Sequence, residues 1–162
     1  AAGGYTWTSA VTMTGNNVLE ITGIPDGTTQ IFVSVEECSW ITSHNNAMQF
    51  NVGTSSIDTT NSYTWGISYS GTGISQATSA TSYFRCCPAT YQSGTNKMGG
   101  FILITKTASS SWVLSSTLNE LANGNPVANS SGRYFGADEI NKVRFTCNSG
   151  NYDSGRFRVG YA

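Results

Sequence analysis

Side chains that could serve as nucleophile, base or acid are few and scattered along this chain. His44 is the single histidine, so any hydrolase triad built on an imidazole base has to include it. It lies in the polar run His44-Asn45-Asn46, which is typical of a surface loop, and no Gly-x-Ser-x-Gly nucleophile elbow occurs. The sequence therefore predicts no serine-type or cysteine-type catalytic site.

The carboxylates are poorly placed for glycoside hydrolysis, which needs two of them facing one another across the scissile bond. Glu36 and Glu37 are neighbours in a strand-like run, where successive side chains point to opposite faces. Asp153 lies among turn-forming residues and is expected to accept hydrogen bonds from nearby N–H groups. No catalytic residue is predicted.

Four cysteines occur, and their spacing does not predict a disulfide framework. Cys86 and Cys87 are adjacent, and an adjacent pair bridges only with strain. A zinc site is the alternative, but the chain has one histidine and no Cys-x-x-Cys spacing. Three of the four lie in strand-like runs, so the cysteines are expected to be buried free thiols. No metal or cofactor is predicted.

Aromatic residues at two-residue spacing offer a different chemistry, the stacking of a ring against a sugar. Tyr63, Trp65 and Tyr69 are predicted to share one side of a strand. That side is either exposed, as a sugar-binding row, or packed in the core, as is more usual for large aromatic side chains. Tyr5 and Trp7 are candidate contacts with a partner subunit, with packing against the last strand as the alternative.

Three arginines near the C-terminus form a local cluster in a chain of which only 10% is charged. Alternation places Arg144, Arg156 and Arg158 on the same outward face of adjacent strands, where like charges repel. Either carboxylates such as Glu36 or Asp138 neutralise them, or the row docks against an acidic surface of a neighbouring subunit.

Length and composition limit the remaining classes. The 162 residues suit one domain, 1–162, with a sizeable core. Ser, Thr, Asn and Gly supply the polarity in place of charge, as in sheets and tight turns. The net charge is −1, so no general attraction to nucleic acid or to an anionic membrane is expected. No apolar run approaches the roughly 20 residues of a membrane helix.

Strand patterns with a period of two run through most of the chain, and no amphipathic helix is apparent beyond one turn at 119–122. In the run 30–40, Ile31 and Val33 are expected on one face, and Phe32, Cys38 and Trp40 on the other. We predict about ten short strands in an all-β, antiparallel, jelly-roll-like β-sandwich. The expected strands are 5–13, 18–21, 30–40, 47–52, 63–69, 83–87, 101–107, 112–118, 132–136, 143–147 and 157–161.

Five stretches of sequence carry a resemblance to a known family. The hairpin GGFILITKTASSSWVLSSTL, followed later by INKVRFTCNSGNYDSGRFRVGYA, resembles a C-terminal domain of tail-associated proteins of tailed bacteriophages. In that family the last strands read Ile-x-x-Val-Arg and an apolar run, an Asn/Gly loop, and then Phe/Tyr-Asp-x-Gly before a closing strand. IPDGTTQIFVSVEECSW, AMQFNVG and NSYTWGISYSG are similar to its front half, so the resemblance spans residues 23–161.

The resemblance implies a non-enzymatic β-sandwich on the virion surface, assembled in the host cytoplasm and often displayed as a trimer. Its expected partners are other virion proteins and a host surface glycan. Residues 1–22 lie outside the resemblance, and their aromatic side chains predict N-terminal strands that contact a partner subunit. The exposed edges expected of such sheets also favour a homotrimer. The first hypothesis is a tail fibre or appendage tip that attaches to a host receptor. The alternatives are a capsid decoration protein and, third, a glycan hydrolase.

Overall fold

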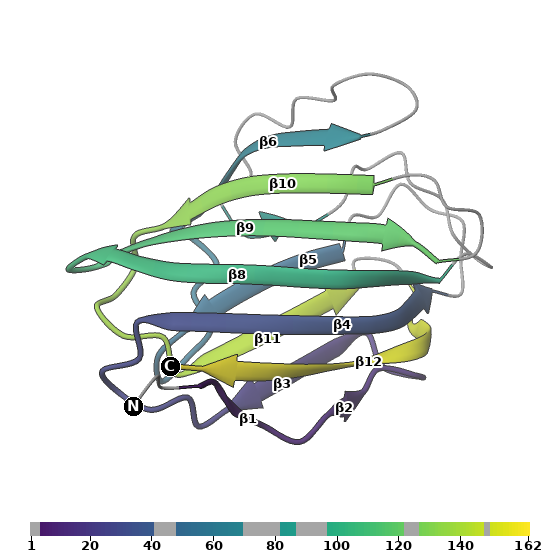
Figure 1. Ribbon diagram of the computed structural model, residues 1–162, viewed down its shortest axis with the longest axis horizontal. Coiled ribbons are helices and arrows are strands. Elements are labelled where there is room, and N and C mark those ends of the chain that lie inside the picture. Colours follow the sequence, from purple (N-terminus) through teal and green to yellow (C-terminus); the bar gives the residue numbers. More distant parts are fainter. Residues whose placement is uncertain (1–3, 41–47, 70–81, 87–96, 122–126, 148–149) are drawn as a thin grey trace.

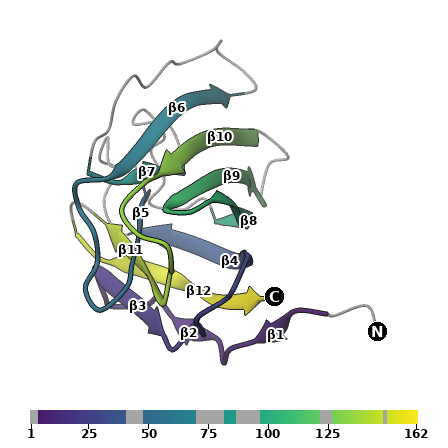
Figure 2. The ribbon, with the colours of Figure 1, turned by 90° about the vertical axis from the view of Figure 1, so that its left-hand side faces the viewer.

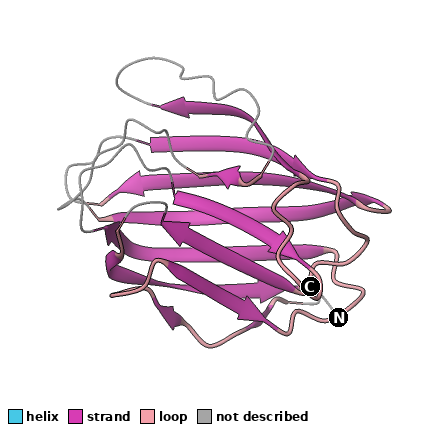
Figure 3. Cartoon of the chain, turned by 180° about the vertical axis from the view of Figure 1, so that it is seen from behind, coloured by secondary structure: helices cyan, strands magenta, loops and turns pink. Residues whose placement is uncertain are grey.

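The computed structural model describes residues 4–40, 48–69, 82–86, 97–121, 127–147 and 150–162. These residues form twelve β-strands and no helix (Figures 1 and 3). The side chains of Tyr63, 65–69 and Glu120 lie outside the description. In the part of the chain covered, no helix is long and apolar enough to span a membrane. The expected all-β class is confirmed.

The strands form two antiparallel sheets that pack face to face (Figures 1 and 2). The larger sheet has the order β1 (Thr6–Trp7), β12 (Tyr152–Tyr161), β4 (Gln30–Trp40), β8 (Met98–Ala108), β9 (Ser111–Glu120), β10 (Val127–Tyr134) and β6 (Ser62–Tyr69), with β2 (Val11–Thr12) also paired to β12. The smaller sheet has the order β3 (Val18–Thr22), β11 (Lys142–Cys147), β5 (Met48–Gly53) and β7 (Phe84–Arg85).

The connections between the sheets have jelly-roll character. The chain passes from one sheet to the other at every step from β2 to β8, and again between β10 and β11 and between β11 and β12. The first and last strands are therefore neighbours in one sheet, while the third and eleventh are neighbours in the other, as in a jelly roll. Strands β9, β10 and β6 extend the larger sheet beyond β8 (Figure 1). The expected jelly-roll-like β-sandwich is confirmed.

The core lies between the sheets and is filled by the alternate, inward-facing residues of both. Phe145 of β11 lies 4.9 Å from Phe157 of β12, edge to face, so the two sheets meet through aromatic rings. Phe50 of β5 lies 5.1 Å from Phe145 on the same inner layer. All three rings are buried, as are the large side chains Trp40 and Trp112. This continuous apolar layer fixes which strand faces point outward.

A β-bulge in β4 corrects one expectation about its faces. The pairing of β4 with β8 shifts register between Val35 and Cys38, and Glu37 has a positive φ of 50°. The extra residue reverses the parity, so Cys38 and Trp40 point into the core with Val35. The prediction that Cys38 and Trp40 share the face of Phe32 is therefore wrong. Phe32 stays half-buried on the outer face.

The N-terminal segment is also less regular than predicted. The run 5–13 was expected to form one alternating strand, but it forms two short strands, β1 and β2, that both pair with β12 (Figure 2). Between them the amide of Thr8 donates to the carbonyl of Val159 at 2.8 Å, and the amide of Val159 donates to Thr8 Oγ1 at 3.0 Å. The segment thus covers one edge of the larger sheet.

Candidate functional site

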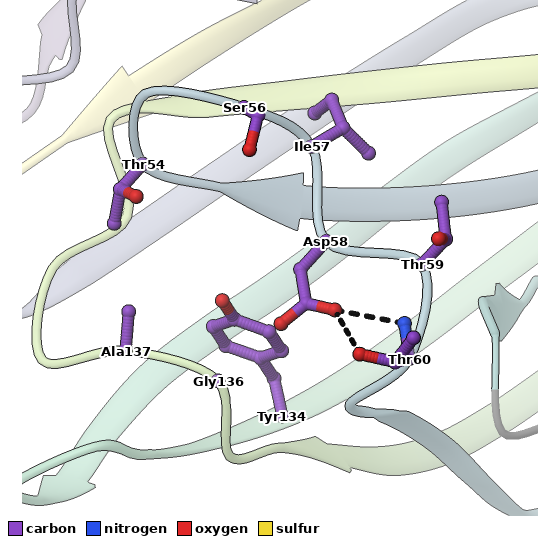
Figure 4. Close-up of a pocket in the computed structure, with 9 residues that line it drawn as sticks. All are labelled: Thr54, Ser56, Ile57, Asp58, Thr59, Thr60, Tyr134, Gly136 and Ala137. Carbon is purple, nitrogen blue, oxygen red and sulfur yellow. Dashed lines mark hydrogen bonds between the residues drawn. The ribbon is translucent and has the colours of Figure 1, made fainter.

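One hollow lies where the chain after β5 meets the end of β10 (Figure 4). Its volume is about 350 Å³. The polar side chain of Asp58 points toward the ring of Tyr134 (Figure 4). The lining residues are Thr54, Ser56, Ile57, Asp58, Thr59, Thr60, Tyr134, Gly136 and Ala137.

Asp58 is the hydrogen-bonding centre of this pocket. Its Oδ1 accepts hydrogen bonds from the amide of Thr60 at 2.8 Å, from Thr60 Oγ1 at 2.9 Å and from the amide of Asn61 at 3.2 Å. Its Oδ2 accepts one from Asn61 Nδ2 at 2.7 Å. The hydroxyl of buried Tyr134 donates to the same carboxylate. Both carboxylate oxygens are therefore engaged within the protein.

The protonation of the pair follows from these contacts. Burial raises the pKa of Asp58, but the hydrogen bonds from Asn61 and Thr60 outweigh it, so the pKa of Asp58 lies below its usual value. Burial, helped by the charge of Asp58, raises the pKa of Tyr134 to about 12. At neutral pH Asp58 is ionised and Tyr134 is a neutral donor. The arrangement joins the loop 54–61 to β10, and we assign it a structural role.

A second feature, on the outer face of the larger sheet, is a group of aromatic rings. The rings of Tyr5 and Phe32 lie 6.0 Å apart, those of Trp7 and Phe32 lie 5.8 Å apart, and Phe32 stacks on Phe101 at 5.3 Å. Trp7 is 41% exposed and Phe101 is 36% exposed. The rings come from β4, β8 and the N-terminal segment, which meet through pairing to β12 and β4. We call Tyr5, Trp7, Phe32, Phe101 and the adjoining Arg158 the outer aromatic surface.

Local pairing explains the position of Trp7. Trp7 is directly opposite Gly160, and a Cβ atom at Gly160 would lie 3.0 Å from the indole ring. The bare glycine therefore lets the indole lie close to β12. The guanidinium carbon of Arg158 lies 4.6 Å from the centre of the same ring, within cation–π range. Arg158 and Trp7 thus hold one another at the exposed edge of this surface.

The neighbouring charges on β12 are arranged differently. Arg156 Nε lies 2.6 Å from Glu36 Oε2 and is neutralised on the surface. No ion pair between described residues includes Arg158, which is exposed. A hollow of about 460 Å³ beside Arg156 is lined by Thr12, Glu36, Glu37, Gly155 and Arg156. Its carboxylates are already paired, since Glu37 also binds Lys97 at 2.8 Å.

The prediction that three arginines share one face is wrong. Strand β11 belongs to the smaller sheet and β12 to the larger one, so Arg144 lies on the opposite side of the sandwich from Arg156 and Arg158. Arg144 Nε donates to Glu20 Oε1 at 2.7 Å across the β3–β11 pair. The chain between β11 and β12 crosses between sheets, and alternation within each strand could not show this.

The predicted sugar-binding row lies in β6, the edge strand beside β10. Tyr63 is opposite Arg133, and Tyr69 is opposite Ala128. The register shifts between them, and Trp65 is the residue without a partner in the ladder. This shift interrupts the two-residue period from which the row was predicted. The three side chains lie outside the description, so their role as a sugar site stays a prediction.

Several other predicted residues have a definite place. Cys38, Cys86 and Cys147 are buried thiols, and their expected burial is confirmed. Cys87 and His44 lie outside the described residues. Within the described ranges, no group of three or more His, Cys, Asp or Glu side chains could hold a metal ion.

Phe32 and Phe101 were missed as functional candidates. The sequence does carry a signal for them. Each is an aromatic residue on the outward side of a strand whose inward side is apolar and buried.

The chain matches no protein-family model, no curated protein and no solved structure. Function must therefore be inferred from the residues and their arrangement.

Proposed function

We propose that this protein is a non-enzymatic surface protein of a bacteriophage particle that attaches to a glycan on the host, as the tip domain of a tail fibre or appendage does. The observation that carries the proposal is the outer aromatic surface. Monomeric proteins seldom expose a contiguous group of large rings without a partner for it. Here Trp7, Phe32 and Phe101 are held together on a broad, rigid sheet.

The sequence resemblance to the C-terminal domains of phage tail-associated proteins supports the same function. The stretches that carry it correspond to β4–β6, to the hairpin of β8 and β9, and to β11 and β12. A jelly-roll-like sandwich is the fold expected for such a domain. A binding site on strands, rather than on loops, also suits attachment, because the sheet holds the side chains in fixed positions.

A non-catalytic role is supported by the state of the acidic residues near hollows. Asp58 accepts hydrogen bonds on both oxygens, and Glu36 and Glu37 are paired with Arg156 and Lys97. A glycosidase needs a carboxylic acid with a raised pKa opposite a second carboxylate. The pKa of Asp58 is lowered instead.

A capsid decoration protein is the second candidate. It is favoured by the position of Tyr5 and Trp7 in the N-terminal edge segment, where they would reach an adjacent subunit of a shell.

In either role we expect a homotrimer, with a particle mass three times the 17.2 kDa of one chain in light scattering. A clean monomer at micromolar concentration would contradict the trimer.

The test of attachment is a glycan array that carries bacterial surface polysaccharides, probed with the purified, labelled protein. We expect saturable binding to a subset of the polysaccharides and no release of new reducing ends from them. Binding to none of them would contradict the attachment function, and measurable turnover would promote the hydrolase. A map of the assembled particle separates a tail position from a position on the shell.

A further inference from the structure

We propose that the outer aromatic surface recognises an acidic saccharide, and that Arg158 binds the carboxylate of its sugar unit. The inference rests on the proposed function, glycan attachment, and adds the chemical class of the glycan and the residue that selects it. It follows from the position of Arg158, from the charges around it and from the side chains in the same cross-strand row.

Arg158 is held in place by a contact that leaves its hydrogen-bond donors free. Its guanidinium carbon lies 4.6 Å from the centre of the Trp7 ring. A guanidinium has five N–H donors, and a single ring contact cannot occupy all of them. No hydrogen bond or ion pair with a described residue engages them. Arg158 is thus an exposed cation, in contact with Trp7, that has N–H donors available.

The surrounding charges make Arg158 complementary to an anion. On the same strand and face, Arg156 is neutralised by Glu36 at 2.6 Å. The other guanidinium of this face without an ion pair in the described structure is Arg133, on β10. It lies over Phe135 at 4.2 Å and is separated from β12 by three strands. A planar guanidinium binds a carboxylate in a bidentate manner, with charge-assisted hydrogen bonds.

The cross-strand row beside Arg158 favours a saccharide as the carrier of that anion. Arg158 is opposite Ser34, and Ser34 is opposite Phe101. Since neighbouring strands lie about 4.8 Å apart, the backbones of Arg158 and Phe101 are separated by roughly 10 Å, with the small Ser34 between them. A sugar ring over Ser34 would place its apolar C–H face near the rings of Phe101 and Phe32 and its carboxylate near Arg158.

Uncharged polar groups continue the same row. Phe101 is opposite Thr117, and Thr117 is opposite Asn129. Thr117 Oγ1 donates to Asn129 Oδ1 at 2.7 Å, which leaves the amide nitrogen of Asn129 pointing away from this bond as a donor. Both residues lie on the outer face. Rings beside hydroxyl and amide groups match the alternating apolar and hydroxyl surfaces of a saccharide chain.

The experiment compares native acidic oligosaccharides with their carboxyl-reduced forms. The probes are oligomers of galacturonic acid, of N-acetylneuraminic acid, and of glucuronic acid alternating with N-acetylglucosamine. Reduction converts each carboxylate to a primary alcohol and leaves the rest of the sugar unchanged. The intact chain is tested as wild type and as Arg158→Gln. The controls are Arg156→Gln, on the same strand and face, and Arg133→Gln, the other guanidinium of this face without an ion pair in the described structure. Unchanged thermal unfolding shows that each variant is folded.

We expect the wild type to bind at least one native probe and to bind its reduced form at least about tenfold more weakly, because a charge-assisted bidentate contact is lost. Arg158→Gln should show the same loss toward the native probe and no further loss toward the reduced one, since both changes remove one interaction. Arg158→Lys should fall between, because it keeps the charge but not the planar fork. The two control variants should bind within about twofold of wild type.

The outcomes separate this inference from the proposed function. Equal binding of native and reduced probes, or an equal loss in Arg156→Gln, overturns the acidic selectivity and leaves glycan attachment in place. Binding of no probe in either form overturns the inference, and an empty polysaccharide array overturns attachment as well. A change in the oligomer mass of Arg158→Gln, with unaltered sugar binding, assigns Arg158 to a subunit contact and also overturns the inference.

Discussion

Trp7 lies across Gly160, directly opposite it on the neighbouring strand, and a Cβ atom there would come within 3.0 Å of the indole. Because Gly160 has no side chain, the exposed indole of Trp7 can lie close to the backbone of β12. The guanidinium carbon of Arg158 lies 4.6 Å from the centre of the Trp7 ring. The pair of Trp7 and Gly160 therefore also positions the charged edge of the outer aromatic surface.

Gly160→Ala should displace Trp7 and weaken its contact with Arg158. We expect a loss of unfolding free energy of about 0.5–1 kcal/mol, because the crowded ring is at the surface and can move. In a Trp7→Ala background the same change should cost nothing measurable. Denaturant unfolding of the four proteins of this cycle measures the coupling. Additive effects would show that the two residues do not touch in solution.

Gly136→Ala should disrupt the joint between the loop 54–61 and β10. A Cβ atom at Gly136 would collide with Asp58 Oδ2 and with the hydroxyl of Tyr134. We expect a cost of at least about 2 kcal/mol, since overpacking adds to the loss of a charge-assisted hydrogen bond. Gly4→Ala is the control, because a Cβ atom at Gly4 would meet nothing within 4 Å. Equal melting temperatures for the two variants would contradict the assigned role of Asp58.

Tyr134 should make the protein lose stability in alkali. Its folded-state pKa is raised to about 12, and the unfolded value is near 10. The folded state therefore favours the neutral phenol, and this stabilisation is complete below about pH 10 and declines as the pH rises toward 12. Chemical unfolding across that range should show a shallower decline for Tyr134→Phe than for wild type or for Tyr5→Phe. Parallel curves for wild type and Tyr134→Phe would refute the shift.

Glu37 offers a test of the bulge in β4. Its φ of 50° lies in the left-handed region, where glycine is favoured and β-branched residues are strained. Glu37→Gly should be more stable than Glu37→Val by about 1–2 kcal/mol. In a regular strand the order would be reversed, because valine has the higher β propensity. Both variants lack the ion pair with Lys97, so the comparison isolates the backbone. A more stable valine variant would show that β4 is regular.

Much of the secondary structure could be predicted because strand alternation is a local property. The run 30–40 and the hairpin of β8 and β9 appear where the pattern places them. Strand β10 begins at Val127, earlier than the expected residue 132, because its inward positions hold small residues and its outward ones are polar. Its inward side includes Ala128 and Ser130, so no apolar alternation marks it.

What the sequence could not show depends on long-range geometry. The residues of β11 and β12 would look the same in a hairpin as in two strands of different sheets. Because the two strands belong to different sheets, Arg144 is separated from Arg158. The outer aromatic surface likewise joins residues distant in sequence, since Trp7, Phe32 and Phe101 meet only after β12 and β4 pair. Tyr5 and Trp7 could be selected from the sequence, with packing against the last strand as one alternative, but their contacts with Phe32 could not.

The most direct test of the central claim is the adsorption of the labelled protein to host bacterial cells after removal of the outer aromatic surface. The double variant Trp7→Ala, Phe101→Ala should adsorb at least about tenfold more weakly than wild type. Aromatic rings that become buried when a ligand binds contribute much of the binding free energy. Val113→Ala, which truncates a side chain of β9 that is 40% exposed, is the control and should adsorb within about twofold of wild type. A folded double variant that adsorbs as well as wild type would contradict the account.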